Sequence, residues 1–403
     1  MLDPSPFHDS KDRPQVRIAR GEGPYDNTRK ALESVDLSPA KGKKVLLKPN
    51  VGRVAEIGSG VVTNPEVVAA AIDAFQEVGA EVSIGESPIL GVDVMEAFEA
   101  CGVAAVAKDR DVPLINMDER KYVEVPLPEG VAIQSLRVCP EVLEHDIVVS
   151  IPVLKTHMHT GVSLAIKNMK GCLWRRSKVD LHMLPPVEGY DGKSLDMAIA
   201  DMSYAMRPHL SIMDGTVGME GLGPSAGEPK PMGIVIVGVD PFACDAVAMR
   251  LMGIEPQEAP HLWLAAQRGY GVFDIDRIDV SPDDWLDAGV PFARPPKNLT
   301  IEYPNINILD ENSCSGCQST LLLFLKRFQE ELADYFPEGE MINIAIGKGH
   351  EELPEGTLCI GNCTRMHKDV GMYVPGCPPV GSAIINAIKE NGPTKDADDE
   401  DNK

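Results

Sequence analysis

The sequence predicts a two-domain α/β protein, with a large, mainly parallel sheet in the first domain and a smaller α/β unit after it. Its 403 residues exceed what one hydrophobic core usually serves. Short apolar strands alternate with helical segments, an order typical of a parallel sheet covered on both faces. The Pro- and Gly-rich segment 287–298 separates two such regions, so we expect domains at 1–298 and 299–392 and an acidic, disordered tail at 393–403.

The first half of the large domain shows the alternation most clearly, and we expect it to be Rossmann-like. KKVLLKPN (43–50) has the composition of a buried strand, NPEVVAAAIDAFQEVGA (64–80) has helical apolar spacing, and EVSIGES (81–87) fits the next strand. Residues 121–140 are predicted to form an antiparallel excursion. Residues 157–194 are rich in His, Lys, Gly and Pro and have weak periodicity, which indicates a long functional loop around a short helix.

The second half of the large domain continues the pattern. HDIVVSIPVLK (145–155) is expected to be one central strand, and HLSIMDG (209–215) and MGIVIVGVD (232–240) fit two more, separated by a glycine-rich connection. In the small domain the strands INILD, MINIAIG and TLCIGN alternate with two apolar helices, STLLLFLKRFQEELADYF and VGSAIINAIKEN.

Composition restricts the partners. The formal net charge is −23, with a pI near 4.8. This balance argues against binding to nucleic-acid backbones or anionic membrane surfaces. The first residues lack the basic and apolar regions of a signal peptide, and no apolar run approaches the roughly 20 residues that cross a bilayer. We therefore expect a cytoplasmic protein without membrane insertion.

Nine cysteines in a reducing compartment are a poor fit to a disulfide framework. Four of them are scattered singly, whereas five fall in the last quarter of the chain, and this crowding indicates a metal site. These five are Cys314, Cys317, Cys359, Cys363 and Cys377.

Four of the five follow predicted strands, at the edge where open α/β sheets bind ligands. Cys314 and Cys317 lie between a strand and a helix, and their spacing lets both sulfurs reach one metal. Cys363 follows TLCIGN, and Cys377 precedes two prolines. Cys359 lies within a strand, so it is only a reserve ligand. Zinc ribbons use two close cysteine pairs, and one pair is close here, so iron–sulfur is favoured over zinc.

The segments SCSGCQSTLL, IGNCT and PGCPP resemble, in that order, the proximal-cluster segments of the small subunit of nickel–iron hydrogenases. They resemble less closely the cluster-bearing small subunit of respiratory complex I. The resemblance covers residues 304–390 and implies a flavodoxin-like domain with one [4Fe–4S] cluster. It also implies the four ligands Cys314, Cys317, Cys363 and Cys377. Hydrogenases usually have GTC where this chain has GNC, and no segment here resembles their medial and distal cluster domain.

A second resemblance covers the large domain. The strings LLKPN, TNPEVV, IGESP, IPVLKTHMHTG, LAIKNMKG, DGTVGMEGLGP and VGVDPFACDAVA resemble, in order, the family called domain of unknown function 362. The resemblance extends over roughly residues 40–290 and implies no common reaction. Many members carry a C-x-x-C-x-x-C ferredoxin segment, which this sequence lacks, so the C-terminal cluster domain would take its place.

Lysines flank several strand ends in this acidic chain, with glycine-rich turns nearby. Cations and backbone N–H groups at strand ends suit an anionic ligand such as a carboxylate, a phosphate or a cofactor tail. Alternatively, these lysines cap carbonyls or pair with Glu86, Asp214 or Glu220, and the glycines merely make turns. The candidate anion-binding residues are Lys48, Lys155, Lys167 and Lys170.

Three further sets of residues could have a catalytic or metal-binding role, and each also has a purely structural explanation. His157, His159 and His182 suit a metal or proton-transfer site, or are simply hydrogen-bonded or solvated. Cys172 has basic neighbours that would lower its thiol pKa, so it suits a redox-active or additional ligand cysteine, or it simply packs. Four carboxylates suit cation binding or acid–base catalysis, although helix capping explains Asp240 equally well. These are Asp214, Glu220, Asp240 and Asp245.

The leading hypothesis is an iron–sulfur protein that carries single electrons from a donor either to a partner protein or to a small anionic substrate bound in the large domain. Reduction of such a substrate would make it an iron–sulfur oxidoreductase. A second hypothesis is a non-catalytic assembly or accessory factor with a structural or sensory cluster. A third is a redox-independent enzyme that contains structural zinc.

Overall fold

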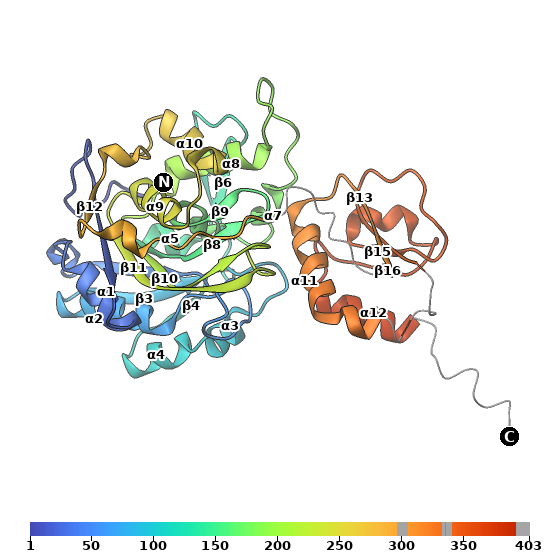
Figure 1. The fold of residues 1–403 in the computed structure, drawn as a ribbon, viewed down its shortest axis with the longest axis horizontal. Helices are drawn as coiled ribbons and strands as arrows, with labels where there is room; N and C mark the ends of the chain where they lie inside the picture. The colour runs from blue at the N-terminus through green and yellow to red at the C-terminus, as the bar shows by residue number, and fades with distance from the viewer. Residues whose placement is uncertain (296–304, 333–334, 336–340, 392–403) are drawn as a thin grey trace. The chain divides into compact units, whose positions relative to one another are not determined.

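A computed structural model describes residues 1–295, 305–332, 335 and 341–391 (Figure 1). The chain divides into two compact units, Met1–Pro295 and Pro296–Lys403. The predicted linker 287–298 lies partly outside the described residues, and the predicted tail 393–403 lies entirely outside them.

The first unit is built on a ten-stranded, mostly parallel sheet, which confirms the predicted α/β class. Eight strands follow one another in the order β12-β1-β11-β10-β7-β2-β3-β4, and β8 and β9 extend the sheet from β10. The strands are β1 (Gln15–Arg20), β2 (Lys44–Pro49), β3 (Glu81–Glu86), β4 (Leu114–Asn116), β7 (Ile147–Ile151), β8 (Val153–His157), β9 (Gly161–Ser163), β10 (Leu210–Glu220), β11 (Glu228–Gly238) and β12 (Asp279–Ser281). The antiparallel pair β5 (Val123–Pro126) and β6 (Ser135–Val138) confirms the predicted excursion.

Helices cover both faces of this sheet (Figure 1). One apolar core contains Phe75 of α2 and Phe98 of α3, and the other contains Met202 of α8 and Phe242 of α9. The helices are α1 (Pro24–Leu32), α2 (Pro65–Glu77), α3 (Val94–Ala100), α4 (Val103–Asp109), α5 (Pro140–Glu144), α6 (Ala165–Asn168), α7 (Ser177–Asp180), α8 (Ser194–Ala205), α9 (Pro241–Leu251) and α10 (Pro260–Gln267). Short 3₁₀ turns lie at η1 (Ser38–Ala40), η2 (Met169–Cys172), η3 (Pro256–Glu258), η4 (Ile275–Arg277) and η5 (Trp285–Ala288).

Local sequence explains where two of these helices begin. Asn64 caps α2 by accepting a hydrogen bond from the Glu66 N–H, and Asp240 caps α9 by accepting one from the Phe242 N–H at 2.8 Å. A proline follows each cap at the first helical position, where its missing N–H costs nothing.

The structure corrects two predictions. The expected single strand 145–155 is divided at Pro152, because proline has no N–H for the ladder. After the break, β8 pairs with β9 and β10. The connection expected between 215 and 232 is largely a long antiparallel hairpin of β10 and β11. Its glycines permit close backbone approach: a Cβ on Gly218 would lie 2.7 Å from the Leu154 carbonyl oxygen.

The second unit contains a parallel sheet in the order β13-β14-β15-β16. Its apolar core includes Leu325 of α11 and Ile384 of α12. The elements are β13 (Ile306–Glu311), α11 (Ser315–Leu332), β14 (Ile342–Gly347), β15 (Leu358–Ile360), η6 (Asn362–His367), β16 (Tyr373–Val374) and α12 (Gly381–Asn391). Among the described helices of both units, none is both long enough and apolar enough to span a bilayer.

Candidate functional site

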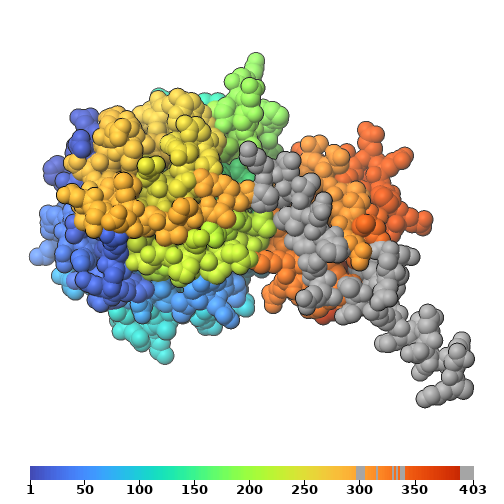
Figure 2. Space-filling model, viewed as in Figure 1, coloured from blue at the N-terminus to red at the C-terminus, as the bar shows by residue number. Residues whose placement is uncertain are grey.

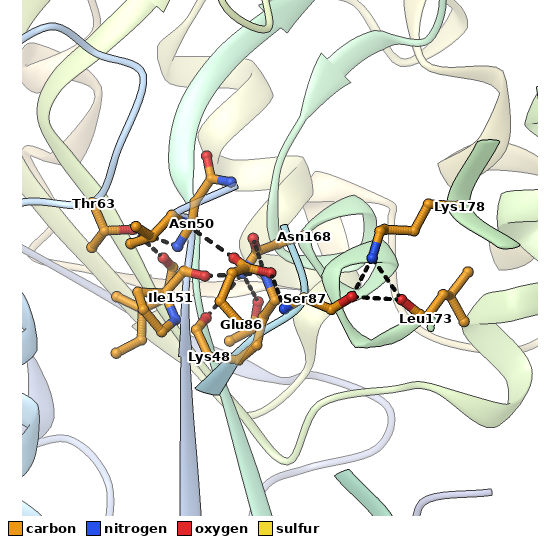
Figure 3. A network of polar contacts seen from close by, with 12 residues as sticks. Lys48, Asn50, Thr63, Glu86, Ser87, Ile151, Asn168, Leu173 and Lys178 are labelled. Atoms are coloured by element: carbon orange, nitrogen blue, oxygen red, sulfur yellow. Dashed lines mark hydrogen bonds and ion pairs between the residues drawn. The ribbon is translucent and has the colours of Figure 1, made fainter. Parts of the chain in front are cut away.

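A buried polar network lies at the carboxyl ends of β2 and β3 (Figure 3). The Lys48 Nζ donates to Glu86 Oε2 at 2.7 Å, to Asn168 Oδ1 at 3.0 Å and to the Pro49 carbonyl at 3.0 Å. The Lys48 and Glu86 side chains are each 1% exposed. Both oxygens of Glu86 also accept backbone N–H groups, from Val51 and from the next residue in the chain.

This network uses all three Lys48 protons, so Lys48 has no donor left for a ligand. For this residue the alternative interpretation, pairing with Glu86, holds. Gly171 is required beside the pair, because a Cβ there would lie 2.4 Å from Lys48 Nζ. The pair fixes the backbone that follows β2 and the short helix α6 that carries Asn168.

Lys155 in β8 lies in the neighbouring part of the site. Its Nζ donates to Asn50 Oδ1 at 2.5 Å and to the Val61 carbonyl at 2.5 Å. Burial, followed by the charges of Arg53 and Lys48, lowers the pKa of Lys155 to about 7. One of its three donors has no protein acceptor in the described structure, so Lys155 is able to contact a ligand.

Five basic side chains from the segment 157–182, together with Lys155, form what we call the lysine–histidine cluster. Its members are Lys155, His157, His159, Lys167, Lys170 and His182. The His157 and His159 rings lie 5.9 Å apart between centroids, and His157 Nδ1 accepts the His159 N–H at 3.1 Å. The Lys170 Nζ lies 2.6 Å from His182 Nε2.

Burial shifts the pKa values of this cluster downward. It lowers the pKa of Lys170 to about 7 and that of Lys167 well below the usual lysine range, where the charges of Lys170 and Lys155 add to the effect. Burial also lowers the pKa of His159 to about 3, and that of His157 and His182 well below 6.5. The histidines are therefore neutral at pH 7, and the lysines lose protons far more readily than exposed lysines.

Lys193 connects a projecting surface segment to the lysine–histidine cluster through a hydrogen bond. The segment 181–193, between α7 and α8, projects from the large unit (Figure 2). At its base the Lys193 Nζ donates to the His159 carbonyl at 3.0 Å. Next to Lys193, at the start of α8, Asp196 Oδ1 lies 3.9 Å from His261 Nδ1 of α10. Neither atom has a hydrogen-bond partner in the described structure.

The predicted carboxylates have mainly structural contacts. Asp240 caps α9 and pairs with Arg207 at 3.0 Å. Glu220 pairs with Lys230. Asp214 accepts the Asn64 N–H at 2.7 Å. Both oxygens of Asp245 accept backbone N–H groups at the start of α6, and burial raises the pKa of Asp245 to about 8.

Cys172 differs from its prediction. Its side chain is fully buried, and this burial raises its pKa to about 12 instead of lowering it. The packing alternative therefore holds for Cys172, because the basic residues nearby in sequence do not outweigh desolvation.

In the second unit, the predicted ligands follow the carboxyl ends of parallel strands. Cys314 and Cys317 follow β13, Cys363 lies in η6 after β15, and Cys377 follows β16. The side-chain hydrogen bond from Cys317, assisted by backbone N–H groups at the start of α11, lowers the pKa of Cys314 to about 6. The pKa of Cys317 is raised, first by its bond to Cys314, then by burial and the charges of Cys363 and Cys377.

The cysteines form no disulfide, and the reserve ligand Cys359 is turned to a different neighbour. Cys359 lies in β15, and its Sγ donates to the carbonyl of His367 in η6 at 3.7 Å. Glycine is needed beside Cys317: Gly361 has φ +93°, and a Cβ there would lie 3.3 Å from Cys317 Sγ. Within the described residues, no three His, Cys, Asp or Glu side chains are gathered as a bound metal ion requires.

Sequence reasoning missed Arg53, Lys178, Asp196 and His261. The Lys178 Nζ donates to Ser87 Oγ and to the Leu173 carbonyl. Asp196 and His261 lie on separate helices, and each is surrounded in sequence by apolar residues typical of a core. Only the folded arrangement places them near Lys167, whose charge contributes to lowering the pKa of His261.

The structure defines a class of α/β protein with a buried, lysine-rich polar site at the strand ends of a mostly parallel sheet. The chain belongs to the family Domain of unknown function (DUF362), whose model matches residues 45–250. This range includes the whole lysine–histidine cluster, whereas the four predicted metal ligands lie beyond it.

The chain is also similar to individual proteins. It is 30% identical over 231 residues to the thylakoid-associated protein sll1697 of Synechocystis sp., a match that covers 57% of this chain and 69% of the relative. The lactate racemase apoprotein of Thermoanaerobacterium thermosaccharolyticum is 14% identical, with a TM-score of 0.39. That match covers 59% of this chain and 57% of the racemase chain, so it spans little more than half of the racemase.

Proposed function

We propose that the protein carries single electrons through one [4Fe–4S] cluster in its C-terminal unit. In this proposal, the electrons pass to a redox partner protein or to a small anionic substrate held by the lysine–histidine cluster. The proposed ligands are Cys314, Cys317, Cys363 and Cys377. The observation that carries the proposal is the position of these four thiols, all of which follow carboxyl ends in one parallel sheet.

The donor set fits such a cluster chemically. Iron–sulfur clusters are held by four cysteine thiolates, and the Cys314 thiol, with its pKa of about 6, is readily deprotonated. Hydrogen bonds to the sulfurs and burial adjust the reduction potential. Backbone N–H groups at the start of α11 donate to the Cys314 sulfur, and Cys317 is buried. A four-iron cubane spaces its thiolates more widely than a single ion does. The four cysteine sulfurs therefore need to surround a space the size of the cluster, and they do not need to converge on a single ion.

Two hydrogen bonds connect the segment that contains Cys363 to the segment that contains Cys377. Gly376 donates its N–H to Asn362 Oδ1 at 3.0 Å, and the Asn362 N–H donates to the Gly376 carbonyl at 2.8 Å. These bonds join the residues beside Cys363 to those beside Cys377. They support a flavodoxin-like cluster domain, as the resemblance to hydrogenase small subunits implies.

The anion-binding part of the proposal depends on the large unit. The hydrogen bonds of Lys155, Lys167 and Lys170 in the described structure go to neutral groups, and a bound anion would supply a counter-charge. Reduction of such an anion would make the protein an oxidoreductase. The proposal places it in the cytoplasm, where thiols remain reduced.

Iron and acid-labile sulfide on anaerobically purified protein test the proposal. We expect about four of each per chain, and we expect Cys317→Ser to lose most of both. Cys101→Ala, a buried cysteine of the large unit, is the matched control and should keep the wild-type content. Stoichiometric zinc without sulfide would overturn the proposal. Loss of iron in Cys359→Ser but not in Cys363→Ser would overturn the ligand assignment.

A further inference from the structure

Lys167 lies at the centre of the lysine–histidine cluster. Strand pairing places Lys155 of β8 opposite Ser163 of β9, and the Lys167 Nζ donates to Ser163 Oγ at 3.3 Å. Lys170 follows three residues later, one helical turn along, so the two side chains are neighbours. Lys167 is partly exposed, and its hydrogen bond to Ser163 lies in a partly buried setting.

The Lys167 amine lacks the partners that normally keep a lysine charged. Its single hydrogen bond goes to a neutral hydroxyl, and it forms no ion pair in the described structure. Burial and the adjacent charges of Lys170 and Lys155 lower its pKa well below the usual value. Such an environment, with desolvation beside other cations, is one of those that activate a lysine as a nucleophile.

Three buried polar atoms near this amine have no hydrogen-bond partner in the described structure. They are His159 Nε2, Asp196 Oδ1 and His261 Nδ1. Buried polar atoms are nearly always satisfied, and exceptions mark sites with a further role. The charge of Lys167 acts on all three residues, and Asp196 Oδ1 lies 3.9 Å from His261 Nδ1.

We propose that Lys167 forms an imine with an aldehyde or ketone that carries a carboxylate, and that Lys155 and Lys170 hold the carboxylate. This inference rests on the proposed anion site and names the substrate class of that site. It does not depend on the iron–sulfur cluster.

The step balances without an oxidant or reductant. The Nζ lone pair of Lys167 forms a bond to the carbonyl carbon, and the carbonyl oxygen takes up a proton to become a hydroxyl. The nitrogen then loses its protons as the C=N bond forms and the hydroxyl departs as water. Amine and carbonyl thus give imine and water.

The neighbouring histidines suit the proton transfers of this step. Because His157 Nδ1 accepts a backbone N–H, the proton of the neutral ring lies on Nε2. The unpartnered His159 Nε2 is able to exchange a proton with a bound carbonyl. His157 Nε2–H is therefore a donor, whereas an acceptor nitrogen on the neutral His159 ring is available to take up a proton.

Reductive trapping on the full chain at pH 7 tests the inference. Glyoxylate, a small aldehyde with a carboxylate, is added with cyanoborohydride, and labelled lysines are quantified by peptide mass spectrometry. An ordinary lysine is only about 0.04% neutral at pH 7, so we expect Lys167 to be labelled at least roughly tenfold faster than the exposed Lys41. Glycolaldehyde, which has no carboxylate, should show a smaller preference, because it keeps the advantage of the neutral amine but lacks the contact with Lys155 and Lys170.

Matched variants separate the possible outcomes. Lys167→Arg keeps a cation without the nucleophile and should lose the fast-labelled site, whereas Lys41→Arg should keep it. Equal labelling of Lys167 and Lys41 in wild-type protein would overturn the inference. Equal preference with glycolaldehyde would overturn the roles of Lys155 and Lys170. Iron and sulfide contents of the same samples report separately on the proposed function, since no lysine variant should change them.

Discussion

The buried Lys48–Glu86 pair gives the sharpest prediction about stability. Lys48→Met leaves Glu86 without its counter-charge, and Glu86→Leu leaves the Lys48 ammonium with only neutral acceptors. Removing one member of a buried pair costs about 3–5 kcal/mol, whereas replacing both with apolar residues is often nearly neutral. Both side chains are 1% exposed, so water cannot screen the charge that remains.

The expected loss is large enough to measure in the large unit. At about 4 kcal/mol per single variant, the melting temperature should fall by roughly 10 °C. The double variant, Lys48→Met with Glu86→Leu, should be more stable than either single one. It will still lose something, because Val51 and Ser87 donate backbone N–H groups to Glu86.

Tryptophan fluorescence during urea or thermal unfolding provides the assay. All three tryptophans, Trp174, Trp263 and Trp285, lie in the first unit, so the signal reports that unit alone. If the free-energy losses of the two single variants simply add in the double variant, the two charges are not coupled. That result would refute the account of this network.

The remaining predictions use the same unit. Asp245→Ala should lower the free energy of unfolding by about 2 kcal/mol, because two backbone N–H groups of α6 lose their acceptor; urea unfolding measures this, and an unchanged midpoint would contradict it. Asp240→Ala should cost about 1 kcal/mol by removing the α9 cap, whereas Asp240→Asn should cost less. Sulfate binding, followed by calorimetry, should weaken as pH rises through 7. Lys155 and Lys170 have pKa values of about 7, so they are cationic below that pH and increasingly neutral above it, and a pH-independent affinity from pH 6 to 8 would argue against their part in anion binding.

Regular apolar patterns made much of the fold predictable. Three predicted elements, the strand near 43–50, the helix near 64–80 and the strand near 81–87, appear as β2, α2 and β3. In each of them the spacing of the apolar residues identifies the face that is buried. The first strand, β1, was missed because it follows a polar start and because Arg17 and Arg20 interrupt its apolar residues. The hairpin of β10 and β11 was missed because its glycines and prolines are typical of a loop.

The candidate site was predictable only in part. Lys155, Lys167 and Lys170 could be suggested because they flank strand ends, but sequence gave no sign that Lys48 is saturated by internal acceptors. The contribution of Asp196 depends on how α8 packs against α10, a contact between distant segments. Burial raises the pKa of Cys172, and this burial could not be inferred from the charged residues beside Cys172 in the sequence.

The central claim is that the C-terminal unit carries electrons, and a potentiometric titration followed by EPR tests it most directly. Anaerobic wild-type protein is reduced and reoxidised stepwise in the presence of mediators. The account predicts one reversible one-electron transition of an iron–sulfur signal that Cys317→Ser abolishes. A protein without such a signal, or one whose signal is lost irreversibly in the first cycle, would contradict it.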